Sequence, residues 1–146
     1  KITLGDFNTA EVEIERTCCF ELYGKNLLSL KTAGALNFDL GRVEVAERYF
    51  KAYADISRQN AEVFFYLSSI AILKKNFELA EEFAREAINL RSNYAVAFNN
   101  LSIACLNLGK FALARFAIEK ALSFEPENDE MKKNAARLEE ILNKNQ

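Results

Sequence analysis

The feature that most constrains this chain is a recurrence of the same kinds of side chain every 34 residues. Phe64 is matched by Phe98 at that spacing, and Ala80 is matched by Ala114. The other matched pairs are Leu67 with Leu101, Ser68 with Ser102, Phe77 with Phe111 and Ala87 with Ala121. A fixed period of this size is typical of stacked helical units, none of which buries its apolar face alone. The sequence therefore predicts an all-α fold, an α-solenoid built from helix pairs.

Each unit contains two segments of helical periodicity separated by a short break. In residues 61–94 we expect one helix from about residue 61 to 74 and a second from about 78 to 90, with the break at Lys75 and Asn76. Gly41 and Gly109 occupy the same break in the flanking units, and glycine there allows a left-handed turn. Small residues at two fixed positions predict where the helices of a unit cross closely. They are Gly34, Ser68 and Ser102 on the first helices, and Ala46, Ala80 and Ala114 on the second.

This pattern resembles the tetratricopeptide repeat. Residues 95–128 carry the resemblance most clearly, through Phe98, Leu101-Ser102, Gly109-Lys110-Phe111, Ala114, Ala121 and Pro126. The resemblance implies a right-handed superhelix of antiparallel helix pairs with a concave groove. It also implies a protein-interaction function and no enzymatic activity.

The period divides the chain into units. We expect full repeats at residues 27–60, 61–94 and 95–128. Residues 1–26 fit the end of an earlier first helix, a second helix and a connector, because Gly5, Phe7 and Ala10 repeat the second half of a unit. Residues 129–146 are expected to form a capping helix with Met131 and Leu138 on its apolar stripe. Since residue 1 falls inside a unit, we expect the chain to be the C-terminal part of a longer array.

Composition argues against several classes of function. The chain has no histidine, which removes histidine-based catalysis and most zinc sites. The net charge of −2, without a basic stripe, argues against nucleic acid as a partner. Its apolar runs are too short to cross a membrane. We therefore expect no cofactor, no metal, no nucleic-acid partner and no membrane insertion.

Cysteine is sparse and odd in number. Cys18, Cys19 and Cys105 lack the paired spacings of a zinc site, and we expect them to be small buried hydrophobes in a reducing compartment. A redox role for the adjacent Cys18 and Cys19 is the alternative. We expect a cytoplasmic protein, with the periplasm or another compartment left open because the sequence starts at Lys1.

The resemblance places candidate ligand-binding residues on the first helix of each repeat, where the family lines its concave groove. Asparagine amides there can pair with both sides of a peptide bond, and apolar side chains can form pockets. For Ile72, Ile103 and Leu106 the alternative is packing between repeats, and for Asn99 and Asn100 it is a solvated or intramolecular polar pair. The candidates are Lys31, Phe65, Tyr66, Ser69, Ile72, Asn99, Asn100, Ile103, Asn107 and Asn134.

Some members of this family clamp the C-terminal carboxylate of chaperone tails with a lysine, two asparagines and a basic pair. Lys31 fits the lysine, but Ala35 and Tyr66 stand where asparagine is required. Val96 and Asn100 stand where the basic pair is required. The resemblance therefore implies weak or no binding of acidic C-terminal chaperone peptides.

The second helices carry many charged residues on one face. Pairs four residues apart, such as Glu47 with Lys51 and Glu81 with Arg85, are typical of a solvated helix face. We expect this face to be exposed to solvent and to have no role in acid–base chemistry.

The sequence thus predicts a non-enzymatic module that holds a peptide or helix of a partner protein. One alternative is a subunit of a larger assembly of the secretion or motility type, with self-association possible. Another is a regulatory arm of an enzyme whose catalytic domain lies before Lys1.

Overall fold

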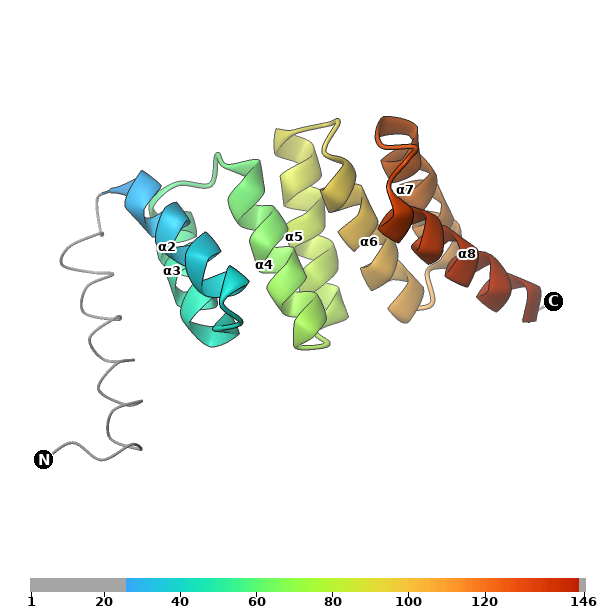
Figure 1. Cartoon of the computed structure of the whole chain (residues 1–146), viewed down its shortest axis with the longest axis horizontal. Coiled ribbons are helices and arrows are strands. Elements are labelled where there is room, and N and C mark those ends of the chain that lie inside the picture. The colour runs from blue at the N-terminus through green and yellow to red at the C-terminus, as the bar shows by residue number, and fades with distance from the viewer. Residues whose placement is uncertain (1–25, 145–146) are drawn as a thin grey trace, which may run out of the picture. The chain divides into compact units, whose positions relative to one another are not determined.

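The computed structural model describes residues 26–144, and within that range the chain forms seven α-helices and no strand (Figure 1). The helices are α2 (Leu27–Asp39), α3 (Val43–Ile56), α4 (Ala61–Leu73), α5 (Phe77–Leu90), α6 (Ala95–Asn107), α7 (Phe111–Phe124) and α8 (Asp129–Lys144). The predicted all-α helical-repeat fold is confirmed. The expected half repeat, with Cys18 and Cys19, lies outside the described residues.

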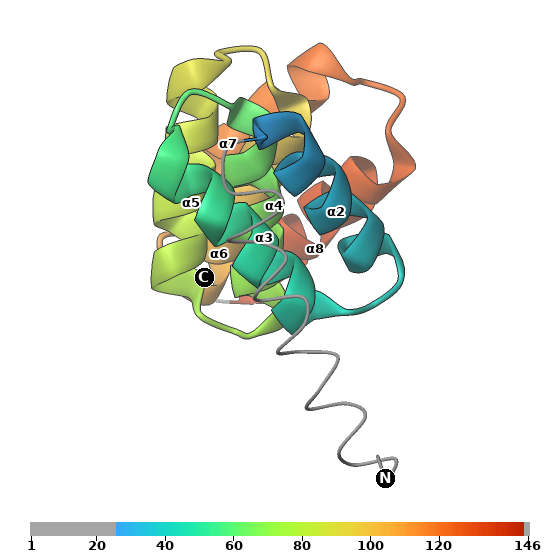
Figure 2. The same ribbon diagram turned by 90° about the vertical axis from the view of Figure 1, so that its left-hand side faces the viewer.

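The helices belong to two compact units. The first unit ends at Gln59 and contains α2 and α3, and the second begins at Asn60 and contains α4 to α8. The pairs α2–α3, α4–α5 and α6–α7 are each made of two antiparallel helices joined by a short turn (Figures 1 and 2).

The turns inside the pairs share one backbone geometry. Gly41 and Gly109 have φ of 78° and 77°, so the predicted left-handed turn is confirmed. Lys75 stands at the same place with φ of 60°, a conformation that costs a side chain with a Cβ more than glycine. In each turn an amide donates back across the helix end, as from Asn76 to the Ala71 carbonyl over 2.9 Å. The helices around Lys75 end at Leu73 and resume at Phe77, each one residue earlier than expected.

Asparagine side chains cap the N-termini of α2, α4 and α8. The side-chain oxygens of Asn26, Asn60 and Asn128 accept from amides three residues ahead, over 3.1–3.2 Å. These residues are 34 and 68 positions apart, so the cap is part of the repeat. Tyr94 stands at the corresponding position before α6 and makes no side-chain cap bond.

The close crossing of α2 and α3 depends on Gly34, which has no side chain. A Cβ placed on Gly34 would lie 2.7 Å from the ring of Phe50, which is fully buried. Glycine at this position therefore lets the two helices approach, as the small residues in the sequence predict.

Two apolar clusters lie among the described residues of the second unit. A large one joins α5, α6, α7 and α8 and includes Phe98, Leu101, Met131 and Leu138, all with exposed fractions of 6% or less. A small one consists of Ala71, Ala80 and Ala104. Cys105 lies in the large cluster, and burial raises the pKa of its thiol to about 11. That thiol is therefore a poor nucleophile.

Candidate functional site

The helices α4, α6 and α8 carry the predicted binding residues of the second unit. Side-chain hydrogen bonds connect them in order. The amide of Asn100 on α6 donates to the hydroxyls of Ser68 and Ser69 on α4, over 2.8 and 2.9 Å. We call the surface along these helices the α4–α6–α8 face. It carries Phe65, Tyr66, Ser69 and Ile72 from α4, Asn99, Asn100, Ile103, Leu106 and Asn107 from α6, and Asn134 from α8.

Asparagines on α6 are bonded within the molecule. Asn99 and Asn100 have exposed fractions of only 6% and 7%. Asn134 donates to the Asn99 oxygen over 2.9 Å, and Asn107, which is exposed, donates to the Ile103 carbonyl over 2.8 Å. Asn99 and Asn100 thus hold neighbouring helices together, and a ligand-binding role for them stays a prediction.

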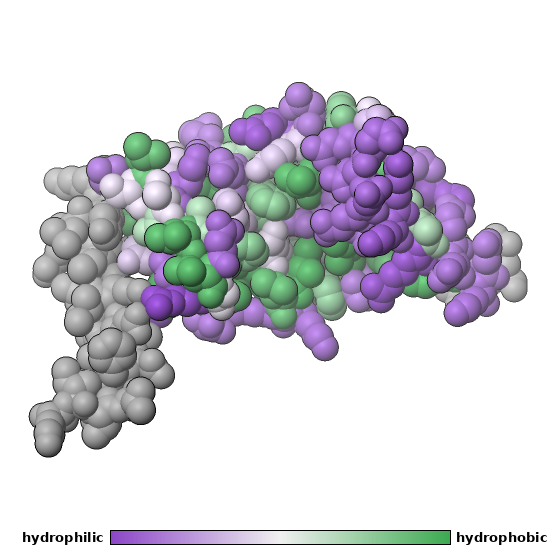
Figure 3. All heavy atoms as spheres, in the orientation of Figure 1, coloured by the Kyte–Doolittle hydropathy of each residue, from purple (hydrophilic) through white to green (hydrophobic). Residues whose placement is uncertain are grey.

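Apolar residues on this face differ in how they pack. Ile72 packs against the small cluster, and Leu106 against the large one, so both contribute to the core. Ile103 is half-buried and belongs to neither cluster. In Figure 3 apolar side chains gather over α4 and α6, whereas polar side chains cover α8.

One end of the face is aromatic. The ring centroid of Phe65 lies 5.4 Å from that of Tyr66 and 5.7 Å from that of Tyr94. The guanidinium of Arg91 lies over the Tyr94 ring, 4.3 Å from its centroid. Burial, followed by the charge of Glu62, raises the pKa of Tyr94 to about 12. The phenol therefore stays protonated and can donate a hydrogen bond.

A hollow of about 430 Å³ adjoins this aromatic group. It is lined by Arg91, Asn93, Tyr94, Ala95, Val96, Phe124 and Glu125. Phe124 is 41% exposed, and its ring centroid lies 6.0 Å from that of Phe98 with the two rings tilted by 39°, so apolar surface is accessible there.

The charged faces of α3 and α5 differ from the prediction at one residue of α5. Glu47 and Arg85 make the expected contacts, with Lys51 at 3.7 Å and with Glu81 at 2.8 Å. Glu81, however, is only 7% exposed, so its predicted position on a solvated face is wrong. Lys110, from the turn before α7, donates to it over 2.6 Å and so links the two pairs.

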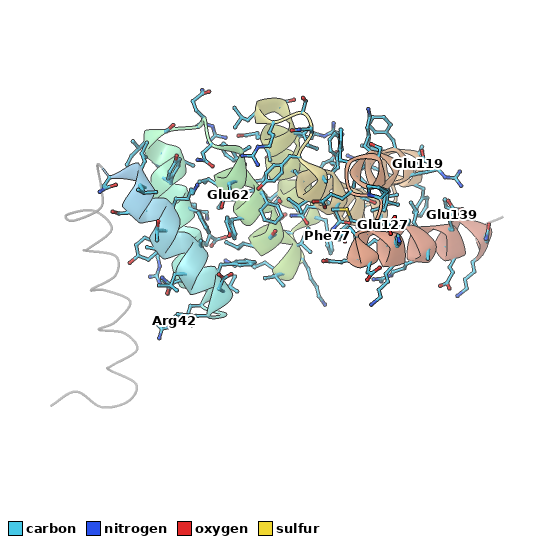
Figure 4. The ribbon with its side chains drawn as sticks, turned by 45° about the horizontal axis from the view of Figure 1, so that its top comes forward. Arg42, Glu62, Phe77, Glu119, Glu127 and Glu139 are labelled. Atoms are coloured by element: carbon cyan, nitrogen blue, oxygen red, sulfur yellow. The ribbon has the colours of Figure 1, made fainter. Side chains whose placement is uncertain are left out.

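The helix α8 is tied to its neighbours on two sides. Arg115 of α7 donates to Glu139 over 2.6 Å, and it also lies 3.8 Å from Glu119 on its own helix. Glu119 and Glu139 are labelled in Figure 4. On the other side Asn134 bonds Asn99 of α6. These contacts set the rotation of α8 about its own axis.

Lys31 is the candidate that belongs to the first unit. It lies half-buried on α2, in the first unit.

Within residues 26–144 no group of His, Cys, Asp and Glu side chains could hold a metal ion. No helix of that range is both long enough and apolar enough to cross a membrane.

Residues 61–94 and 95–128 each match the sequence profile of the tetratricopeptide repeat. Residues 61–128 belong to the tetratricopeptide repeat family. A comparison with curated proteins gives no significant match.

Several solved structures share the fold of this chain. The first repeat domain of Spaghetti (RPAP3), bound to the HSP90 peptide SRMEEVD, is 24% identical, with 82% of this chain and 94% of that chain covered and a TM-score of 0.76. MamA is 20% identical, with 96% and 85% covered and a TM-score of 0.77. The second repeat domain of human RPAP3, in complex with the HSP70 peptide SGPTIEEVD, is 25% identical, with 77% and 93% covered and a TM-score of 0.71.

Two features of this chain escaped the sequence reasoning. The ion pair of Lys110 with Glu81 joins residues 29 positions apart, and no local pattern reveals it. The hollow beside Tyr94 was also missed, although an aromatic residue in place of the recurrent cap asparagine was a visible signal.

Proposed function

We propose that this chain is a protein-interaction module whose α4–α6–α8 face binds a peptide or helix of another protein. The observation that carries the proposal is the difference between the two kinds of helix. The face keeps partly exposed Phe65, Tyr66 and Ile103, and α6 has no charged residue at all. On α5, by contrast, glutamates and an arginine alternate with the buried alanines. Partly exposed apolar surface with few charges is typical of the centre of an interface.

The comparisons support this function. The tetratricopeptide repeat is typically a non-enzymatic interaction scaffold, and two of the similar structures hold peptides of other proteins. At 24% and 25% identity those peptides indicate the kind of ligand, a short segment of another protein, and leave its sequence open.

Residual hydrogen-bonding capacity of the asparagines suits an extended ligand. The Asn100 oxygen accepts no hydrogen bond within residues 26–144, and the Asn99 amide nitrogen donates none there. A peptide bond offers one donor and one acceptor, which match these two atoms. In this role the asparagines hold the helices together with one side of the amide and bind the ligand backbone with the other.

Selection of random peptides displayed on phage tests the proposal with the whole chain as the target. We expect peptides to be enriched over an unrelated protein of similar charge. Ile103→Asn should weaken their binding about tenfold, because a half-buried apolar side chain contributes roughly 1–2 kcal/mol to a contact. Ile103 is preferred to Asn100 because it makes no side-chain hydrogen bond and lies outside both apolar clusters.

Phe116→Asn is the matched control. Phe116 is 51% exposed on α7, away from the face, so the substitution makes the same change of polarity elsewhere. Circular dichroism and thermal denaturation establish that both variants fold. The proposal is wrong if no peptide is enriched, or if the folded Ile103→Asn variant and the Phe116→Asn variant bind the selected peptides equally.

A further inference from the structure

The positive charge of the α4–α6–α8 face is confined to α8. Neither α4 nor α6 contains a lysine or an arginine. In α8, Lys133 and Arg137 are both exposed and lie four residues apart, on one side of the helix. A partner that lies on this face can therefore meet a positively charged side chain only on α8.

The contacts of α8 show which way this pair is directed. Asn134 bonds α6 and Glu139 bonds α7, so these two residues mark opposite sides of the buried stripe. With about 100° per residue, Arg137 lies about 60° and Lys133 about 100° from Asn134, in the direction away from Glu139. Arg137 therefore continues the α4–α6–α8 face beyond Asn134, and Lys133 lies next to Arg137 on the outer side of α8.

Several other cations of the second unit have partners, whereas this pair has none within residues 26–144. Lys110 and Arg85 share Glu81, Arg115 pairs with Glu139, and Lys132 pairs with Glu127 over 3.4 Å. Within residues 26–144, Lys133 and Arg137 make neither an ion pair nor a side-chain hydrogen bond, although Glu130 and Glu140 lie three residues away from them on the same helix. Their charge is available to a ligand.

We propose that the partner segment of this protein carries acidic side chains that lie on Lys133 and Arg137, next to an apolar stretch that lies on α4 and α6. The proposal rests on the function proposed above and adds the chemistry and direction of the ligand. Apolar contact over Ile103 supplies most of the affinity, and the pair on α8 determines which end of the segment lies there. Complementary charges of this kind act mainly on specificity and on the rate of association.

The peptides selected with the wild-type chain test this directly. We expect Asp and Glu to be enriched on one side of an apolar stretch, relative to the unselected library. Against Lys133→Glu/Arg137→Glu the binding of these peptides should fall about tenfold, and the loss should shrink at high salt because exposed charges are screened. Lys133→Gln/Arg137→Gln, which removes the charge without reversing it, should give a smaller loss in the same direction.

Lys120→Glu/Lys132→Glu is the matched control, with the same change of net charge at exposed residues of α7 and α8 away from the face. It should change the affinity less than about twofold, since surface charges at a distance contribute little. Enriched peptides without acidic bias, or equal losses in the two charge-reversed variants, would overturn the inference and leave the proposed function standing. A failure to enrich any peptide would overturn both.

Discussion

The hydroxyl of Ser102 donates a hydrogen bond to the backbone carbonyl oxygen of Ala114 over 2.9 Å, across the point where α6 crosses α7. Both residues are buried, with exposed fractions of 4% and 0%. They occupy the two positions at which the repeat keeps small side chains, so the sequence pattern marks a direct contact between helices.

This contact predicts different costs for a deletion and for an insertion at the crossing. Ser102→Ala should lower the free energy of unfolding by about 1 kcal/mol, because one buried hydrogen bond is lost while the crossing keeps its spacing. Ala114→Leu should cost about 1–3 kcal/mol, because the larger side chain separates the helices. Denaturation by urea measures both. Ser123→Ala is the control, since that exposed hydroxyl bonds only its own helix, and a loss as large as that of Ser102→Ala would contradict the assignment.

Replacing Lys75 with glycine is expected to stabilise the fold. Lys75 has φ of 60° where the two flanking turns have glycine, so Lys75→Gly should raise the free energy of unfolding by about 0.5–1 kcal/mol. The neighbouring Lys74 has φ of −85°, a conformation open to any residue, so Lys74→Gly should destabilise the chain or leave it unchanged. Thermal denaturation of the two variants separates the backbone effect from the loss of a positive charge. Equal shifts of the melting temperature in the two variants would contradict the predicted backbone effect at Lys75.

Much of the fold follows from the sequence because helix packing repeats with the chain. Gly34 had to be small beside Phe50, and Gly109 had to take a left-handed turn, and both requirements recur at a fixed spacing. The helix ends at Leu73 and Phe77 differ from expectation by one residue, and they fall at the same repeat positions as the helix ends beside Gly41 and Gly109.

The candidate face was less predictable, for a physical reason. The residue types of Asn100 and Ser69 are visible in the sequence, but whether the amide meets a ligand or a serine depends on the distance between α6 and α4. Glu81 is a second case. Its own helix predicts an exposed position, and it is buried because Lys110, from the next repeat, covers it.

The buried Glu81 predicts a dependence of stability on pH. The hydrogen bond from Lys110 is the main cause that lowers the pKa of this carboxyl below its ordinary value of 4.5, and Arg85 adds to it, while burial opposes both. A lowered folded pKa means that the ionised group stabilises the fold fully above pH 4.5 and that this contribution is lost as the pH falls through the folded value. Glu81→Gln should therefore cost about 1–2 kcal/mol at neutral pH and nothing in strong acid.

Urea denaturation of both proteins across the acid range measures this difference. Glu82→Gln is the control, because it removes the same charge from an exposed neighbour on α5. A difference between wild type and Glu81→Gln that stays constant with pH would mean that the side chain acts by packing and not by its charge.

The last prediction concerns the peptide SRMEEVD, which is bound in one of the similar structures. We expect weak or no binding of it to this chain. Tyr66, at one asparagine position of the clamp, lies with its ring against Phe65, and Val96, at one basic position, lines the hollow beside Tyr94. Asn100, at the other basic position, is buried and bonded to α4. The terminal carboxylate would therefore find no lysine or arginine on α4 or α6. Calorimetry with the first repeat domain of RPAP3 as the positive control measures this, and a low-micromolar affinity for this chain would contradict it.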